Sequence, residues 1–314
     1  MPSFDAINYS LRPSKSIQRH VVFDGIDLLK RTLGLDQMLY VGFGSIWFTD
    51  FLLAHRFLRI REMISIEGNE VGHRRALFNA PFATVRVEQG LSGEVLPNLL
   101  ADANLRHQPW LIWLDYDYQL NEAIRNDLQL VIENAPANSM LIATFNGLEN
   151  KYGTALERVD RLRAILGAVV PEDLAKADCK DEMMQKTLAD LTLDFMTATA
   201  AGMARPGGFV PAFRVIYRDM APMVTVGGML PTQGAAMQAK DIIARADWPA
   251  RPERPIRAPH LTLKEAAILQ SKLPRDLPLT RDQVRALGFD LEDDQIEVYQ
   301  RYYRQYPAFA QIVS

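Results

Sequence analysis

Short apolar runs alternate with polar and helix-compatible stretches over the first 150 residues of this chain. Five of the runs are predicted to be strands, and most of these have the continuous apolar composition that is typical of strands buried on both faces. These runs are Met38–Val41, Met63–Glu67, Thr84–Val87, Trp110–Asp115 and Met140–Phe145. The alternation predicts an α/β fold, in which a Rossmann-like, doubly wound parallel sheet is covered by helices on both faces.

The pattern changes after the fifth run. Residues 155–204 have apolar positions at helical spacing, and we expect them to be helical. The segments Phe209–Tyr217 and Met223–Met229 are rich in strand-forming residues and are separated by the turn-like RDMAP. They predict an antiparallel closing hairpin, at a point where a dinucleotide dehydrogenase more often continues with another parallel unit.

Proline and capping residues predict where the domains divide. Residues 248–259 carry four prolines and are expected to form an extended, stiff linker. We therefore expect that the C-terminal domain can be removed by ending the chain near Arg251 without loss of ligand binding. Beyond this segment, Thr262 with Glu265 and Thr280 with Gln283 form capping-box patterns that open helices. The expected domains are a helical cap over residues 1–36, a Rossmann-like domain over residues 37–247 and a small helical domain over residues 260–314.

Composition narrows the class of protein. The formal net charge is −3, whereas a nucleic-acid-binding protein usually has a clear basic surplus, so nucleic acid is not an expected partner. The single cysteine excludes an internal disulfide and a cysteine-rich metal site. No uncharged apolar run is long enough for a membrane span, and we expect a soluble, cytoplasmic protein.

The candidate ligand site begins at the end of the first predicted strand. Gly42, Gly44 and Ser45 form a turn between this strand and a helix, where backbone can approach a ligand closely and free N–H groups can donate. Glu67 ends the second strand, about 25 residues later. An acidic residue at this spacing typically accepts hydrogen bonds from the ribose hydroxyls of a nucleotide ligand.

The order LYVGFG, MISIE, VRVEQGLSGEVLPNL, LIWLDYDY and MLIATFN resembles the class I S-adenosylmethionine-dependent methyltransferases, and most of all the catechol-type O-methyltransferases. The resemblance covers about residues 37–229. It implies that S-adenosylmethionine is the cofactor and that the chain is an enzyme that methylates oxygen. It also implies that Gly90 and Asp115 help to hold the cofactor, and that Asp115, Asp117 and Asn146 lie at the reacting end.

The chain departs from that family at three places. Tyr40 stands where the family usually has an acidic residue, the third glycine of the loop is missing, and Phe145 precedes Asn146 where metal-binding members have an aspartate. Because Mg²⁺ requires several oxygen ligands, a divalent metal is not favoured. We expect Asp117 to cap a helix directly after the fourth strand.

Two rival functions stay open at this point. One is an NAD(P)-dependent oxidoreductase, which the missing glycine and the late hairpin disfavour. The other is a non-catalytic Rossmann-like module that binds a partner.

The acceptor is open as well and is either a small molecule or a protein. Tyr9, Arg12 and Lys15 precede the first strand, where the superfamily places a helix beside the cofactor, and they are candidate acceptor-binding residues. Tyrosines near the C-terminus, among them Tyr299, Tyr302 and Tyr306, predict that the small domain docks on the main domain, on a partner or on a second copy.

Overall fold

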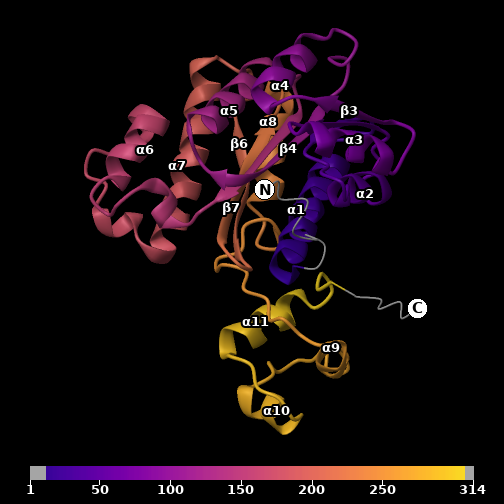
Figure 1. Ribbon diagram of the computed structural model, residues 1–314, viewed down its shortest axis with the longest axis vertical. Coiled ribbons are helices and arrows are strands. Elements are labelled where there is room, and N and C mark those ends of the chain that lie inside the picture. The colour runs from indigo at the N-terminus through magenta and orange to yellow at the C-terminus, as the bar shows by residue number, and fades with distance from the viewer. Residues whose placement is uncertain (1–11, 308–314) are drawn as a thin grey trace.

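A seven-stranded sheet forms the centre of the chain in a computed structural model that describes residues 12–307 (Figure 1). The strands are β1 (Leu39–Gly42), β2 (Glu62–Glu67), β3 (Val85–Gln89), β4 (Trp110–Gln119), β5 (Ser139–Asn146), β6 (Val210–Arg218) and β7 (Pro222–Leu230). Their order across the sheet is β3-β2-β1-β4-β5-β7-β6. The first five strands pair in parallel, and β7 lies between β5 and β6 and is antiparallel to both. This topology confirms the Rossmann-like fold and its closing hairpin.

The helices cover both faces of the sheet. They are α1 (Pro13–Thr32), α2 (Thr49–Arg56), α3 (Glu70–Asn79), α4 (Ser92–Ala101), α5 (Glu122–Asn134), α6 (Arg158–Leu166), α7 (Asp181–Gly202), α8 (Gln233–Ile243), α9 (Leu263–Gln270), α10 (Arg281–Ala286) and α11 (Asp293–Tyr302). No helix in the described part of the chain is long and apolar enough to span a membrane.

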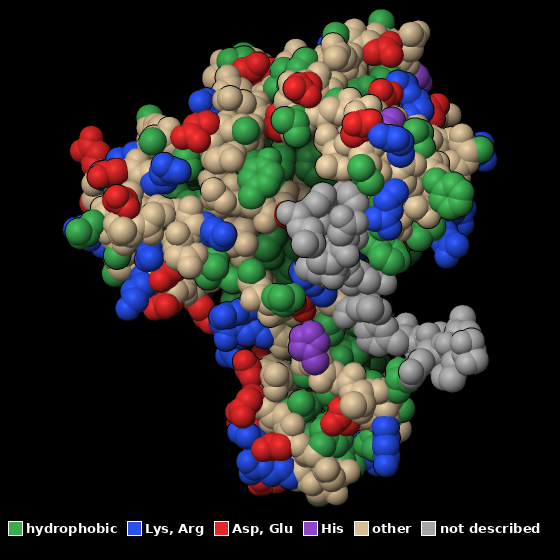
Figure 2. Space-filling view, viewed as in Figure 1, with side chains coloured by type: hydrophobic (Ala, Val, Ile, Leu, Met, Phe, Trp, Pro, Cys, Tyr) green, Lys and Arg blue, Asp and Glu red, His purple; other side chains and the backbone are tan. Residues whose placement is uncertain are grey.

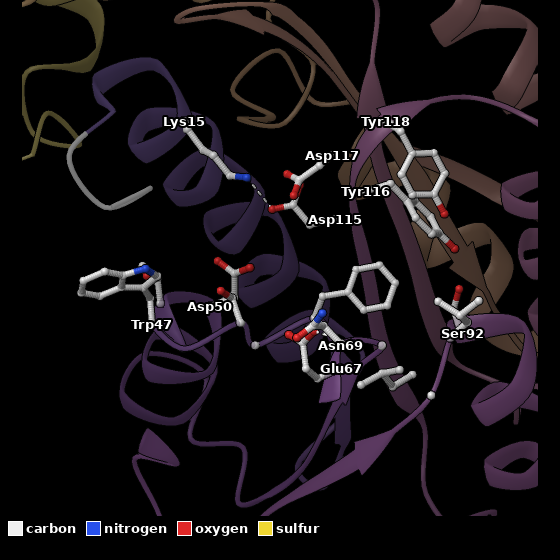
Figure 3. A pocket seen from close by; sticks show the side chains of 18 of the residues that line it. Lys15, Trp47, Asp50, Glu67, Asn69, Ser92, Asp115, Tyr116, Asp117 and Tyr118 are labelled. Carbon is white, nitrogen blue, oxygen red and sulfur yellow. Dashed lines mark hydrogen bonds and ion pairs between the residues drawn. The ribbon is translucent and has the colours of Figure 1, made fainter. Parts of the chain in front are cut away.

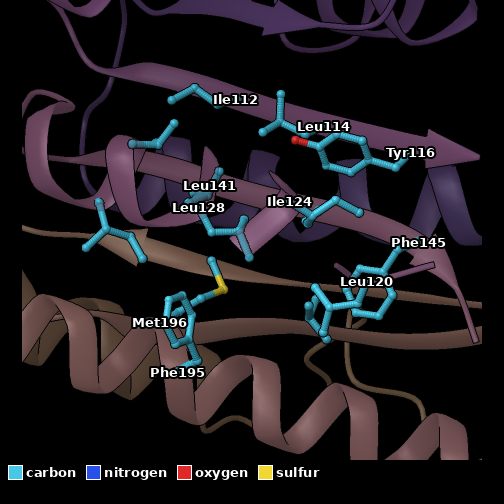
Figure 4. Packing of buried hydrophobic residues seen from close by; sticks show 14 of the residues in the cluster. Ile112, Leu114, Tyr116, Leu120, Ile124, Leu128, Leu141, Phe145, Phe195 and Met196 are labelled. Atoms are coloured by element: carbon cyan, nitrogen blue, oxygen red, sulfur yellow. The ribbon is translucent and has the colours of Figure 1, made fainter. Parts of the chain in front are cut away.

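Two apolar clusters divide the core between the faces. On one face, side chains of α4 to α7 pack on the sheet, as Leu128 of α5 and Met196 of α7 do against Ile112 and Leu141 (Figure 4). On the other face, α1, α2 and α8 pack on alternate residues of the same strands, and Ile17, Phe23 and Ile26 of α1 are fully buried. The N-terminal helix therefore packs in the same core as the sheet.

The structure corrects two predictions about element bounds. The strand expected to end at Asp115 continues to Gln119, so Asp117 lies within β4. Asn121, and not Asp117, caps α5, since its Oδ1 accepts the N–H of Ile124. The region expected to be helical over residues 155–204 is divided into α6 and α7 by a segment that contains Pro171, which lacks an N–H to continue a helix.

The proline-rich segment of residues 248–259 is extended and lies along the edge of the sheet. The backbone of Ile256 accepts from the N–H of Arg218 at 3.0 Å and donates to the carbonyl of Ile216 at 2.8 Å. Ile256 is 1% exposed, and the N–H of Ala258 donates to Ser14 Oγ at the start of α1. This segment therefore packs as part of the main domain.

The residues after this segment form a small domain with its own core of Leu269, Leu279, Val284, Ile296 and Tyr299. Figure 2 shows acidic and basic side chains over its surface. Tyr302 belongs to the core of the main domain, and the hydroxyl of Tyr306 donates to the carbonyl of Pro259 at 2.8 Å. Tyr302 at the end of α11 and Tyr306 after it thus hold the small domain against the main domain.

A chain that ends at His260 is expected to fold, whereas one that ends at Arg251 is expected to be less stable by at least about 1.5 kcal/mol, because it also loses the burial of Ile256. Urea unfolding of both chains measures the difference. Equal stabilities of the two chains would show that the segment does not belong to the main domain.

Candidate functional site

A cavity of about 310 Å³ opens at the carboxyl ends of β1 to β4 (Figure 3). In open α/β sheets, ligands bind outside these strand ends. The predicted cofactor residues Gly44, Ser45, Glu67, Gly90 and Asp115 all line this cavity. It is also lined by Lys15, Arg19, Asp50, Asn69, Ser92, Tyr116, Asp117 and Tyr118, among others.

The turn after β1 has room only for glycine at its centre. A Cβ atom on Gly44 would lie 2.6 Å from the ring of Phe48 and 2.6 Å from Ser65 Oγ, to which the Gly44 N–H donates at 3.0 Å. The next residue, Ser45, has a φ of +50°, and its buried Oγ has no hydrogen-bond partner. Gly42 does not line the cavity and ends the strand that leads into this turn. The turn therefore presents backbone and an unsatisfied hydroxyl to a ligand.

Glu67 ends β2 at the floor of the cavity. Its Oε1 accepts the N–H of Asn69 at 3.0 Å, and its burial raises the pKa of the carboxyl above the ordinary value. Gly90 lies beside it, directly after β3, and its N–H donates to the carbonyl of Glu67 at 3.1 Å. Its φ is +142°, and a Cβ atom there would lie 2.9 Å from Val95. A side chain at this position would be strained, so the position favours glycine, which leaves the cavity open beside Glu67.

Four buried charges line the side of the cavity next to α1. The Lys15 ammonium lies 2.6 Å from Asp115 Oδ2, and Arg19 forms an ion pair with Asp50. All four side chains are at most 12% exposed. The other oxygen of Asp115, Oδ1, is buried without a hydrogen-bond partner. Burial raises the pKa of Asp50, although the Arg19 guanidinium acts against this.

Buried ion pairs contribute little net stability, because the loss of hydration offsets much of their attraction. We call Lys15, Arg19, Asp50 and Asp115 the charge quartet. It contains two positive and two negative groups beside an open cavity, an arrangement suited to a ligand that itself carries both charges.

The opposite side of the cavity is held by hydrogen bonds to Asp127 of α5. The hydroxyls of Tyr116 and Ser92 both donate to Asp127 Oδ2, at 2.7 Å and 2.5 Å. The ring of Tyr116 also packs edge-on against Phe43, with centroids 5.2 Å apart. These contacts fix an aromatic wall at the end of β4.

Three further predicted residues lie beside a second, smaller cavity. Arg12, Asp117 and Asn146 line it together with Lys15, so the chain brings the predicted acceptor-binding and catalytic residues together. Asp117 lies beside Asp115 on the α1 side of β4 (Figure 3). Tyr9 lies outside the described residues.

The Lys15 ammonium forms an ion pair with Asp115, which is the first of the candidate metal ligands. Among residues 12–307, no three His, Cys, Asp or Glu side chains are placed to hold a metal ion. A divalent cation bound to Asp115 would lie close to the Lys15 ammonium, whose positive charge would repel it, so this set of donors does not favour a metal site.

Sequence reasoning missed Arg19 and Asp50 as site residues. The signal for Arg19 was its spacing from Lys15, since residues four apart lie on one face of a helix. Asp50 lies in the first turn of α2, directly after the glycine turn. Nothing in the sequence pairs it with a residue of α1.

Comparisons with solved structures give distant likenesses. An O-methyltransferase from Bacillus cereus, solved in complex with SAH, is 15% identical over 72% of this chain and 84% of its own length, with a TM-score of 0.39. Trm1 from Pyrococcus horikoshii, solved with S-adenosyl-L-methionine, is 12% identical over 72% of this chain, with a TM-score of 0.47. This chain spans 58% of the Trm1 chain.

No curated protein is significantly similar to the chain in sequence. A family model does match, over residues 7–314, and the family is described as "Putative O-methyltransferase". The match includes the cavity, the charge quartet and the small C-terminal domain. The chain is therefore a member of this O-methyltransferase family.

Proposed function

We propose that the chain binds S-adenosylmethionine in the larger cavity and transfers its methyl group to an oxygen atom of a small acceptor. The observation that supports this most is the order of groups along the sheet edge. Glu67 lies at the end of β2, the glycine turn follows β1, and the charge quartet lies between α1 and β4. A ligand with a nucleoside at one end, whose ribose lies at Glu67, and an amino acid at the other matches this order.

Glu67 would accept hydrogen bonds from the two ribose hydroxyls, since a carboxylate can accept both. Gly90 leaves space beside it, and the adenine would lie next to the aromatic wall that contains Tyr116. The turn from Gly44 to Ser45 would lie along the middle of the ligand.

The charge quartet would hold the amino-acid end of the cofactor. An amino acid carries one ammonium and one carboxylate, so each of its charges can lie beside an opposite charge of the quartet without adding net charge. Ser45 Oγ and Asp115 Oδ1, which have no hydrogen-bond partner, are placed to donate to the carboxylate and to accept from the ammonium. The quartet would thus take the place of the acidic residue that Tyr40 replaces.

The bound cofactor would supply an activated methyl group on a sulfonium, which is a good leaving group. The chain then has to align the acceptor oxygen with this methyl group and keep water away, and such positioning accounts for much of the rate of a two-substrate reaction. Asp115 and Asp117 extend from β4 on the side where the cavity meets its smaller neighbour.

Calorimetric titration of the full chain with S-adenosylhomocysteine, 5′-methylthioadenosine and NADH tests this proposal. We expect S-adenosylhomocysteine to bind with micromolar affinity and 5′-methylthioadenosine, which lacks the amino acid, to bind at least about tenfold more weakly. NADH serves as the control that should not bind. Equal affinities for the first two ligands would contradict the role of the quartet.

A further inference from the structure

Strand β3 forms one edge of the seven-stranded sheet. At the other edge, the backbone of Ile256 pairs with β6. In residues 12–307, no segment pairs with the outer side of β3, whose ladder runs to β2 alone. An edge strand of this kind presents backbone N–H and carbonyl groups to which a strand of another chain can add.

The hydrogen bonds between β2 and β3 show which backbone groups face outward. At one end of the ladder, the N–H of Met63 donates to the carbonyl of Thr84 at 3.4 Å. At the other end, the N–H of Gly90 donates to the carbonyl of Glu67 at 3.1 Å. Successive residues of a strand direct their backbone groups to opposite sides. The even-numbered residues of β3 therefore bond to β2, and the odd-numbered residues direct their N–H and carbonyl groups away from the sheet.

The odd-numbered residues of this strand are Val85, Val87 and Gln89. The N–H of Val85 donates to Phe82 in the preceding turn, and His73 Nε2 lies 3.3 Å from the carbonyl oxygen of Val87. This oxygen can accept a second hydrogen bond, since a carbonyl has two lone pairs. Among the described residues, the N–H of Val87 and both backbone groups of Gln89 have no partner. These groups are therefore available to another chain.

The sequence of β3 is self-complementary about Val87. When two copies of the strand run antiparallel with Val87 opposite Val87, these two residues exchange both backbone hydrogen bonds, and Val85 lies opposite Gln89 in the same geometry. Arg86 of each copy then lies opposite Glu88 of the other, with Cβ atoms about 5 Å apart. The side chains of Arg86 and Glu88 are 54% and 34% exposed and pair with each other in the single chain, so they can also reach across.

Neighbouring registers are disfavoured by charge. Because only the odd-numbered residues direct backbone groups outward, the register can shift only in steps that keep these residues opposite each other. The two nearest alternatives centre the pairing on Arg86 or on Glu88. They place two arginines or two glutamates directly opposite each other, which destabilises a strand pair. The charges thus select the register centred on Val87.

An exposed leucine lies on the same side of the molecule as this edge. His73 of α3 reaches the carbonyl of Val87, so its side of the helix faces the edge of β3. Leu77 follows one turn later on that side of α3 and is 53% exposed. A two-fold axis through Val87 would bring Leu77 of both copies to one face of the joined sheet, where burial of these side chains adds to the backbone pairing.

We propose that the chain forms a two-fold symmetric dimer in which the β3 strands of two copies pair antiparallel about Val87. The sheet then continues from one copy into the other, with the charges of Arg86 and Glu88 alternating across the joint. The assembly closes at two copies, because both contribute the same strand. This dimer rests on β3 and α3 and is independent of the proposed function.

Sedimentation velocity of the full chain tests the dimer. We expect the wild type to be mostly dimeric at about 100 μM, and a dilution series gives its dissociation constant. A wild type that stays monomeric at this concentration would overturn the proposal.

Charge reversal tests the register. Arg86→Glu and Glu88→Arg each place like charges opposite each other at two positions, and each should weaken the dimer at least about tenfold. An equimolar mixture of the two variants should dimerise like the wild type, because each strand then faces the opposite charge. The double variant Arg86→Glu, Glu88→Arg should do the same. Arg74→Glu, on the exposed side of α3, is the matched control and should leave the dimer unchanged. Single variants as dimeric as the wild type, or a mixture that stays monomeric, would contradict the register.

The variant Val87→Pro tests the backbone pairing. Proline removes an N–H that points away from β2, so the ladder inside the chain is kept, as it is for prolines on edge strands. We expect this variant to be folded by circular dichroism and monomeric, whereas Val87→Ala, which keeps the N–H, should still dimerise. A folded Val87→Pro variant that dimerises as tightly as Val87→Ala would show that the copies meet through another surface.

Discussion

Replacing Asp50 with alanine is expected to lower the free energy of unfolding by about 3–5 kcal/mol, because it leaves the buried guanidinium of Arg19 without its partner. Arg19 is only 4% exposed and cannot regain its hydration without moving α1 out of the core. Urea unfolding followed by circular dichroism measures the loss.

Two control variants separate this effect from a general weakening of the fold. Asp190→Ala breaks the ion pair with Arg214, which is more exposed, and should cost no more than about 1 kcal/mol. The double variant Arg19→Met, Asp50→Leu removes both buried charges and should recover most of the stability. It should nevertheless bind S-adenosylhomocysteine more weakly than the wild type. A loss for Asp50→Ala as small as that for Asp190→Ala would show that Arg19 does not depend on Asp50.

Replacing Glu67 with alanine is expected to weaken the binding of S-adenosylhomocysteine by about 1.5–3 kcal/mol, the range for hydrogen bonds to a charged group. Glu67→Gln should lose less, since one acceptor oxygen is retained. Calorimetric titration measures both affinities. Glu70→Ala is the matched control, because Glu70 lies three residues later on the exposed side of α3 and pairs with Arg74. Equal affinities of the wild type and Glu67→Ala would mean that Glu67 does not contact the ribose.

The sheet and its closing hairpin were predictable because strands that are buried on both faces have a strong local signal. The runs Trp110–Asp115 and Met140–Phe145 are apolar at almost every position, and both became central strands. The glycine turn and Glu67 were predictable for a similar reason. Their spacing is fixed by one strand–helix–strand unit, so it can be read without knowing the rest of the fold.

The error at Asp117 has a local cause. Alternating polar residues after an apolar run are compatible both with a helix start and with a strand that leaves the core. Here β4 continues past Asp115 with Tyr116 directed at the core and Asp117 on the α1 side, and Asn121 caps the helix instead.

The pairing of the residues in the charge quartet depends on tertiary structure and could not be predicted from the sequence. The residues Lys15 and Arg19 look like the cationic face of a solvated helix, yet both are buried by the sheet and by α2. Their partners Asp50 and Asp115 come from two other elements, 31 and 100 residues further along the chain. Likewise, no local pattern shows that Ile256 joins the edge of β6.

A crystal structure of the full chain with S-adenosylhomocysteine tests the central claim most directly. We predict that the ligand lies in the larger cavity, with its ribose hydroxyls about 2.5–2.7 Å from the carboxylate of Glu67. Its amino-acid end should lie between Ser45 and the charge quartet, and its sulfur should face the smaller cavity. A ligand whose ribose lies away from Glu67, or a cavity that stays empty at millimolar ligand, would contradict the account.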